Sequence, residues 1–222
     1  MSEKMILTLA IIGGTGELGP GLAARWAGAG YRVVIGSRKA KKAQRIAAEL
    51  NESLGIETIM GLENAEAASL ADICILTVKA NAHEAIVDQL KGVLNGKIVV
   101  DTTARVDFKN PQPPAPPAAA RLAQDELGSE ARVVAAFQTV PAHRLREELD
   151  QPLDLDVLVC SDDQEAAQEV MKLAEGAEMR AYYAGELDNA ITLEGISALL
   201  ISLNKYYDSK TATFTVSGLN AG

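Results

Sequence analysis

Apolar positions along the chain follow two patterns that alternate. Short continuous runs such as "CILTV" and "KIVVD" are typical of strands in a parallel sheet that is covered on both faces. Between them, stretches of about 10 to 15 residues have apolar positions spaced as on amphipathic helices. The pattern predicts strands over 6–12, 31–36, 56–60, 72–78, 97–101 and 132–137, and helices over 18–29, 40–53, 63–70, 82–91 and 118–127.

This order of elements predicts an α/β fold. We expect a Rossmann-type doubly wound parallel sheet in residues 1–150, since strand and helix alternate throughout. A small C-terminal α/β capping domain is expected over 151–222, from the strand "LDLDVLVC", the helix "QEAAQEVMKLAEG", the short strand "RAYYAG" and a helix from Leu187 to Tyr206.

Two further segments have their own patterns. The first half of residues 109–120 is predicted to be a stiff surface loop, because each proline removes a donor and restricts the residue before it. The tail "TATFTVSGL", residues 211–219, alternates enough to predict a terminal strand.

Composition narrows the classes of partner. The net charge of −9 and the pI near 4.8 argue against nucleic acid and an anionic membrane as partners. The first apolar run leads into a glycine turn and no run approaches the roughly 20 residues of a membrane span, so a cytoplasmic location is predicted. Cys74 and Cys160 lie in apolar runs and are expected to be buried thiols. His83 and His143 lack metal-ligand spacing, so no metal site is predicted.

A glycine turn follows the first predicted strand. Gly14, Gly16 and Gly19 form G-x-G-x-x-G directly before a predicted helix. Glycines at these places allow a tight turn, close approach of a pyrophosphate and close packing of helix on strand, while free helix amides face the phosphates. The turn predicts a dinucleotide site. A glycine-rich turn that binds nothing is the alternative.

The end of the second predicted strand indicates which dinucleotide. NAD sites usually place a carboxylate there, whereas this chain has Ser37 and Arg38, followed by Lys39, Lys41 and Lys42. Arginine and serine suit a 2′-phosphate. Cations at a helix N-terminus oppose its dipole, so their clustering favours NADP over the alternative of a solvated basic helix start.

Several segments together resemble one protein family. "IIGGTGELGPGLAARWAGAGYRVVIGSRKAKKAQ", "ADICILTV", "VVAAFQTVPA", "LVCSDD" and "AGELDNAITLEGISALLISLN" resemble the F420H2:NADP oxidoreductases, the NADPH-dependent reductases of coenzyme F420. The resemblance covers nearly the whole chain. It implies a Rossmann domain that binds NADP, a small C-terminal domain with the deazaflavin site and dimer contacts, a homodimer, and direct hydride transfer between deazaflavin and nicotinamide.

The resemblance also implies roles for single residues. The glycine turn matches the family's pyrophosphate loop, and the end of the second strand matches its 2′-phosphate site. Later positions match residues that line the dinucleotide or lie beside the stacked rings. The cofactor-binding residues so implied are Gly14, Thr15, Gly16, Glu17, Leu18, Gly19, Ser37, Arg38, Lys42, Val78, Ala82, Ala104, Gln138, Thr139, Val140, Pro141 and Ala142.

Hydride transfer between two rings depends on orientation and exclusion of water, so no proton-transfer residue is assigned. Gln138 is a candidate for bonding the deazaflavin or the nicotinamide carboxamide, and a buried glutamine bonded to backbone is the alternative. His143 lies next to the predicted nicotinamide contact and titrates near neutrality. A histidine at a surface helix start is the alternative for that residue.

Two other functions stay open from the residues. One is an NADPH-dependent reductase of another acceptor, such as a flavin, a ferric complex or a small carbonyl compound. The other is a non-catalytic NADP-sensing module, in which side chains would fill the cleft beside the nicotinamide.

Overall fold

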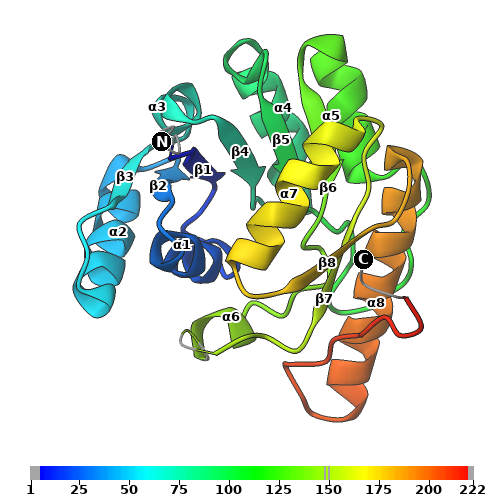
Figure 1. Cartoon of the computed structure of the whole chain (residues 1–222). Helices are drawn as coiled ribbons and strands as arrows, with labels where there is room; N and C mark the ends of the chain where they lie inside the picture. The colour runs from blue at the N-terminus through cyan, green and yellow to red at the C-terminus, as the bar shows by residue number, and fades with distance from the viewer. Residues whose placement is uncertain (1–5, 148, 150, 220–222) are drawn as a thin grey trace.

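A six-stranded parallel sheet forms the centre of the chain. The computed structural model describes residues 6–147, 149 and 151–219, with the sheet order β3-β2-β1-β4-β5-β6 (Figure 1). The strands are β1 Thr8–Ile12, β2 Arg32–Ser37, β3 Ile59–Glu63, β4 Ile73–Leu76, β5 Ile98–Asp101 and β6 Arg132–Ala135. The strand order reverses between β1 and β4, which makes a switch point there. The predicted Rossmann-type α/β fold is confirmed.

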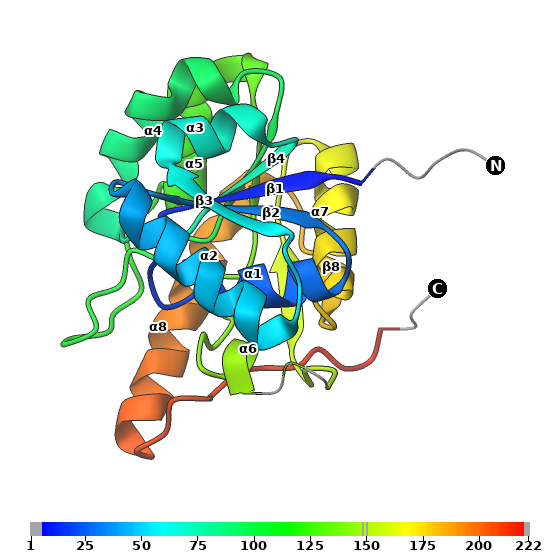
Figure 2. The same ribbon diagram turned by 90° about the vertical axis from the view of Figure 1, so that its left-hand side faces the viewer.

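Helices cover both faces of the sheet (Figure 2). They are α1 Gly19–Gly28, α2 Ala40–Leu54, α3 Asn64–Leu70, α4 Ala80–Leu94, α5 Ala119–Leu127 and α7 Gln164–Gly176, with a short 3-10 turn η1 at Gly128–Glu130. One buried cluster joins α1, α2 and α7 to the sheet, and a second joins α3, α4 and α5 to its other face. Successive strand residues feed the two clusters alternately, as Leu9 and Ala10 do, because neighbouring side chains point to opposite faces.

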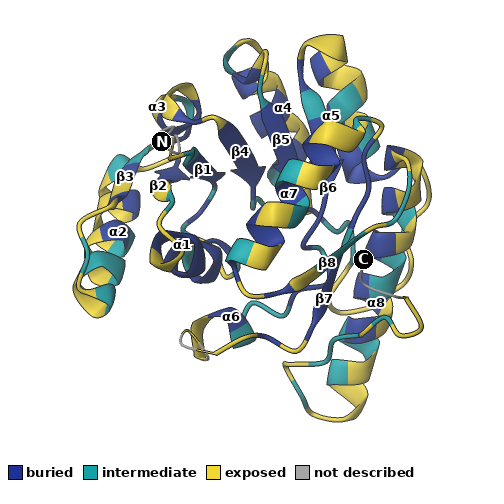
Figure 3. Ribbon diagram, in the orientation of Figure 1, coloured by how far each residue is buried: buried dark blue, intermediate teal, exposed yellow. Residues whose placement is uncertain are grey.

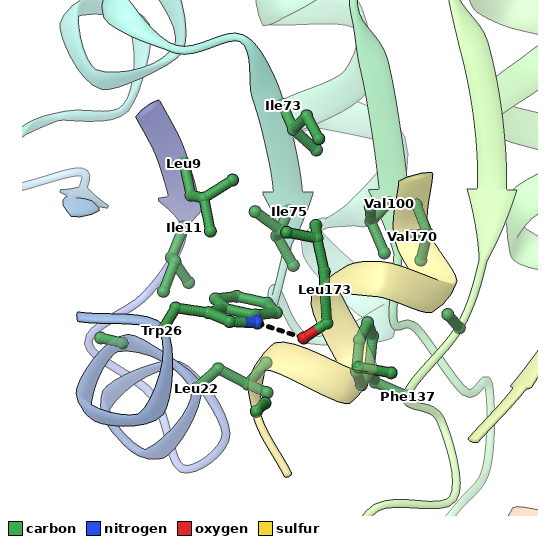
Figure 4. Close-up of a cluster of buried hydrophobic side chains, with 14 of the residues drawn as sticks. Leu9, Ile11, Leu22, Trp26, Ile73, Ile75, Val100, Phe137, Val170 and Leu173 are labelled. Atoms are coloured by element: carbon green, nitrogen blue, oxygen red, sulfur yellow. Dashed lines mark hydrogen bonds between the residues drawn. The ribbon is translucent and has the colours of Figure 1, made fainter. Parts of the chain in front are cut away.

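Trp26 of α1 packs at the centre of the first cluster (Figure 4). Its side chain is fully buried, and its Nε1 donates to the Leu173 carbonyl oxygen of α7 at 2.8 Å. The Phe137 ring meets it edge-on at 5.8 Å between centroids. The indole therefore gains a hydrogen-bond partner while burying a large apolar area, and it fastens a C-terminal helix onto the sheet.

The remaining elements follow β6 in the chain. They are α6 Arg144–Glu147, β7 Asp156–Val159, β8 Arg180–Tyr183, the 3-10 turn η2 Leu187–Asn189 and α8 Ala190–Tyr206. The strands β7 and β8 pair in parallel, and one antiparallel bridge between Ala135 and Cys160 joins them to β6. The start of α8 packs on the second cluster, whereas its last turns carry many exposed residues (Figure 3). The predicted boundary falls beside residue 150, outside the described residues, and two domains remain a proposal.

Two predicted strands differ from the structure. The strand predicted over 56–60 lies at Ile59–Glu63, and residues 211–219, predicted as a strand, form none. In this tail the amide of Ala212 donates to Asn204 Oδ1 at 3.0 Å, and that of Val216 donates to Asp156 Oδ2. Side chains thus take the place of a strand ladder.

The other predictions for local structure are closer. Residues 109–118 have no regular structure, and Cys74 and Cys160 are free and buried, as expected. Burial raises the pKa of the Cys74 thiol to about 12 and that of the Cys160 thiol to about 11, which keeps both protonated. Within the described ranges, no helix is both long and apolar enough to span a bilayer.

Candidate functional site

The glycine turn leaves β1 at the switch point of the sheet. The amide of Gly14 donates to the carbonyl oxygens of Ile11 at 3.1 Å and Gly36 at 2.9 Å. The amide of Gly13 donates to Asn64 Oδ1 at 3.1 Å. These bonds fix the turn against the end of β2 and the start of α3. Ligands of doubly wound sheets bind at this kind of edge.

The three motif glycines have different surroundings. A Cβ on Gly14 would lie 2.6 Å from the Ile11 carbonyl oxygen, and one on Gly19 would lie 2.5 Å from Gly14. Packing within the chain therefore requires these two glycines. A Cβ on Gly16 would meet nothing closer than 3.7 Å. The open space beside Gly16 fits the close approach of a ligand to the backbone.

The turn also offers unpaired donors. Within the part of the chain that the structure describes, the amides of Thr15, Glu17 and Leu18 donate to no protein acceptor. α1 begins directly after them, so its N-terminal end adds positive potential. Arg146 of α6 contacts the carbonyl oxygen of Glu17, and its Nη2 lies 3.3 Å from the Glu17 carboxylate. The turn is therefore held in place with free amides that can donate to an anion.

The end of β2 carries cations without acidic partners. Ser37 is buried at 6% exposure, and its Oγ accepts from the amide of Lys39 at 3.3 Å. Arg38 and Lys42 are exposed, and no carboxylate among the described residues pairs with either. Further along α2, by contrast, Arg45 pairs with Glu49 at 2.6 Å. The rim next to the glycine turn is thus free to bind an anion, and a 2′-phosphate fits it.

Residues after β4 and β5 lie at the same edge. The Thr77 hydroxyl donates to the Ile12 carbonyl oxygen at 3.0 Å, and a Cβ on Gly13 would lie 2.6 Å from Val78 Cγ1. Val78 therefore packs against the glycine turn. Ala82 in the first turn of α4 and Ala104 after β5 are both half-buried. The structure brings these three predicted residues to the edge that carries the turn.

The segment after β6 starts with an unusual backbone. Phe137 has a φ of 70°, the left-handed region, which costs a residue with a Cβ roughly 1–2 kcal/mol. Gln138 follows: its Nε2 donates to the Asp101 carbonyl oxygen at 2.9 Å, and its own carbonyl oxygen accepts from Ser197 Oγ at 3.0 Å. Val140 is buried, and Pro141 and Ala142 are half-buried. The segment is held between β5 and α8.

The two candidate side chains stand differently. Gln138 Oε1 is buried and has no partner among the described residues, although its Nε2 is bonded to backbone. His143 is half-exposed, and its Nε2 lies 3.2 Å from Glu147 Oε1. His143 is therefore at the surface at the start of α6, whereas Gln138 is part of the polar network behind the edge.

Sequence reasoning missed a buried pair behind this edge. His83 Nε2 lies 2.6 Å from Asp101 Oδ2, with side chains 7% and 0% exposed, and Asp101 Oδ1 accepts from the amide of Thr103 at 2.9 Å. Burial alone would lower the pKa of His83, but the hydrogen bond and charge of Asp101, with the charge of Glu194, outweigh burial and the opposing charge of Arg105, so its pKa is raised. An acid at the end of the apolar run "KIVVD" was the available signal.

Two cavities lie away from the glycine turn. One, of about 360 Å³, is between α4 and α5 and has His83 in its lining. The other, of about 550 Å³, lies beside β7 and β8, with Arg180 and Tyr182 in its lining. Neither lining includes a residue of the glycine turn or of the β2 end. The free donors and cations at the edge of the sheet, rather than either of these cavities, identify the candidate site.

Comparison with known proteins identifies the family of this chain. The family model "NADP oxidoreductase coenzyme F420-dependent" matches residues 8–105. The F420-dependent NADP reductase of Methanocaldococcus jannaschii is 39% identical over 229 residues, with 96% of this chain and 99% of that protein covered. The chain belongs to this family. The F420-dependent NADP reductase of Methanothermobacter thermautotrophicus is 36% identical, with 92% of each chain covered.

Solved structures of lower identity share the fold of this F420-dependent NADP oxidoreductase family member. A protein from Arthrobacter sp. FB24, provisionally described as an F420-dependent NADP reductase, has a TM-score of 0.79 at 24% identity, covering 96% of this chain and 100% of that chain. The pyrroline-5-carboxylate reductase of Coxiella burnetii has a TM-score of 0.61 at 17% identity, covering 92% and 71%. At these identities the likeness concerns the fold alone.

Proposed function

We propose that this protein transfers a hydride between NADP(H) and the deazaflavin coenzyme F420. Membership of the F420-dependent NADP oxidoreductase family supports both substrates. The observation that carries the NADP half is the set of unpaired donors and cations at the switch point, formed by the glycine turn and the end of β2. A phosphate-rich dinucleotide suits that edge, because its phosphate oxygens accept hydrogen bonds from the unpaired amides and their negative charge attracts the cations.

The nucleotide is held from its phosphates. The amides of Thr15, Glu17 and Leu18 donate to the pyrophosphate, while Gly16 leaves room for it. Ser37, Arg38 and Lys42 receive the 2′-phosphate, and Arg38 contributes most because its planar fork makes paired hydrogen bonds. Gly14 and Gly19 contribute by allowing the turn to close.

The nicotinamide half extends toward β5 and β6. Val78, Ala82 and Ala104 line this path with small or apolar side chains, so they exclude water without competing for hydrogen bonds. The segment Gln138–Ala142 lies beside the rings, where Val140 and Pro141 give apolar contact and the backbone of Ala142 lies near the carboxamide. Gln138 is held by Asp101 and Ser197 and contributes a polar group there.

The reaction depends mainly on the orientation of the two rings. NADPH supplies the hydride, and F420 takes up this hydride together with one proton from solvent, which leaves NADP⁺ and the reduced deazaflavin. The protein holds the rings in contact and excludes water, which can provide several orders of magnitude of rate without a catalytic acid or base. His143 is paired with Glu147 at the surface, and we assign it no proton transfer.

The C-terminal unit, residues 151–222 in our division, is proposed to complete the deazaflavin site and to form a homodimer. α8 carries exposed apolar residues in its last turns: Leu199 is 60%, Leu203 46% and Tyr206 82% exposed. Their spacing places them along one side of the helix, and such a stripe is typical of an interface.

We place the protein in the cytoplasm, where reduced thiols such as those of Cys74 and Cys160 persist.

The test is direct. Purified protein is mixed with NADPH and F420, and the deazaflavin absorbance is followed from mildly acidic to mildly alkaline pH. Bleaching that depends on both protein and NADPH is expected. Bound NADPH without bleaching at any pH would refute F420 as the acceptor. Parallel reactions with a flavin, a ferric complex and a small carbonyl compound would then identify or exclude another acceptor.

A further inference from the structure

Glu194 of α8 is a buried carboxylate with every oxygen bonded. Its side chain is 1% exposed, although it lies within the apolar run "ITLEGISALL". Oε2 accepts from the amide of Arg105 at 2.9 Å and from Arg105 Nε at 3.0 Å, and Oε1 accepts from the amide of Ala119 at 2.7 Å and from Arg105 Nε at 3.3 Å. A buried carboxylate is tolerated only with such partners, so these bonds and the burial depend on one another.

These bonds hold both ends of one segment. Arg105 precedes and Ala119 follows residues 106–118, which contain five prolines and no regular structure. Prolines cannot donate backbone hydrogen bonds, so the segment has little means of fixing itself. Arg105 Nη2 also donates to the carbonyl oxygen of Ala115 at 2.9 Å. Glu194 therefore fastens residues 106–118 to α8. In Figure 2 the green loop that follows β5 lies next to the orange helix α8.

The same face of α8 holds a second loop. Ser197 lies three residues after Glu194, which places both on one side of the helix. Its side chain is buried, and its Oγ shares its hydrogen between the carbonyl oxygens of Gln138 and Leu193, each at 3.0 Å. Ala104, next to Arg105, and Gln138 are among the residues that we place beside the nicotinamide. One helix face thus fixes both loops that flank the rings.

We propose that Glu194 is a positioning residue for hydride transfer, because it fixes the backbone at Ala104 and Arg105 relative to α8 and thereby sets where the two rings stack. This inference rests on the proposed function. Glu194 touches neither ring and moves no proton. It acts through the backbone and guanidinium of Arg105. Small displacements of stacked reactants cost large factors in rate, so this fastening affects turnover more than binding.

The first test is Glu194→Gln. Gln has one acceptor oxygen, so either the amide of Arg105 or the amide of Ala119 loses its partner. We expect kcat for F420 reduction to fall at least about tenfold, while the Kd for NADPH stays within about twofold, because the phosphate contacts lie on the β1 and β2 side. In the ligand-free protein, the amides of Arg105 and Ala119 should exchange hydrogen faster than in the wild type.

Asp156→Asn is the matched control. Asp156 is also fully buried, and its Oδ1 accepts from Arg180 Nε at 2.6 Å. It lies on β7, and among the described residues its side chain bonds only Arg180 and Val216, so it holds neither α8 nor the backbone at Ala104 and Gln138. Removing its charge tests the general cost of breaking a buried pair, and kcat should stay at the wild-type value. An equal fall in kcat for Asp156→Asn and Glu194→Gln would overturn the positioning role. Wild-type kcat in Glu194→Gln would overturn it as well.

Arg105→Met covers the case in which Glu194→Gln does not fold. Arg105 is 27% exposed in its side chain, and Met keeps much of its apolar length without the guanidinium. It should lower kcat in the same way, and the double variant should fall no further than the more affected single variant. Additive losses, or full activity of Arg105→Met, would overturn the inference. A wild type that binds NADPH but does not reduce F420 would instead overturn the proposed function, and this inference with it.

Discussion

Arg38→Asp is the sharpest test of the 2′-phosphate site. The variant reverses the charge of an exposed residue that has no acidic partner in the described structure. It removes a charge-assisted hydrogen bond worth about 1.5–3 kcal/mol and adds repulsion of about 1 kcal/mol between a surface carboxylate and the phosphate. At 1.4 kcal/mol per factor of ten, NADPH affinity should fall roughly 50- to 1,000-fold. NADH affinity should hold or improve, since a carboxylate can accept from the ribose 2′-hydroxyl.

The assay is a fluorescence titration of each nucleotide at low and at moderate salt. Arg45→Asp is the control, because it makes the same substitution further along α2, where Arg45 only pairs with Glu49 at the surface. Long-range charge effects should be small there and should fade with salt. Equal losses for NADPH and NADH in Arg38→Asp would refute a phosphate contact. So would an NADPH loss no larger than that of Arg45→Asp.

Three other predictions address the turn, the buried pair and α8. Gly16→Ala should leave the melting temperature unchanged and weaken NADPH binding in a titration. Gly14→Ala should lower the free energy of unfolding by about 1–3 kcal/mol in denaturant, because its Cβ meets backbone. Equal melting temperatures for the two variants would contradict this difference. The pKa of His83 is raised because Asp101 outweighs burial, so protonated His83 stabilises the fold fully below its unfolded pKa, and this stabilisation is lost as pH rises through its folded pKa. The free energy of unfolding of His83→Gln, measured by denaturant across pH, should lack this pH-dependent part. A pH dependence equal to that of the wild type would contradict the prediction. Leu199→Glu should yield a monomer by light scattering, and a persistent dimer would exclude this side of α8 as the interface.

Local patterns were sufficient to predict most of the sheet. Continuous apolar runs and amphipathic spacing placed β1, β2, β4, β5 and β6 and the helices between them. The strand predicted over 56–60 lies three residues further along, at Ile59–Glu63, and includes Gly61, a residue that strand propensity disfavours. A Cβ at Gly61 would lie 2.2 Å from the amide nitrogen of Gln44, so close packing of α2 on β3 requires glycine there. Tertiary packing of this kind has no local signal.

The site could be predicted in part. The glycine turn and the end of β2 are contiguous in sequence and carry recognisable chemistry, so their residues could be named. His83, Asp101 and Glu194 are brought together by topology, and each is a single polar residue in or beside an apolar stretch. The strand prediction for 211–219 was wrong because alternation alone does not supply a pairing partner.

Deuterium transfer tests the central claim most directly. NADPH carrying deuterium at the transferable position of its nicotinamide is incubated with F420 and the protein in ordinary water, and the reduced deazaflavin is analysed by mass spectrometry. Direct transfer between stacked rings predicts reduced F420 that carries the deuterium of NADPH. Reduced F420 without deuterium, when both prochiral positions have been labelled in turn, would contradict direct hydride transfer.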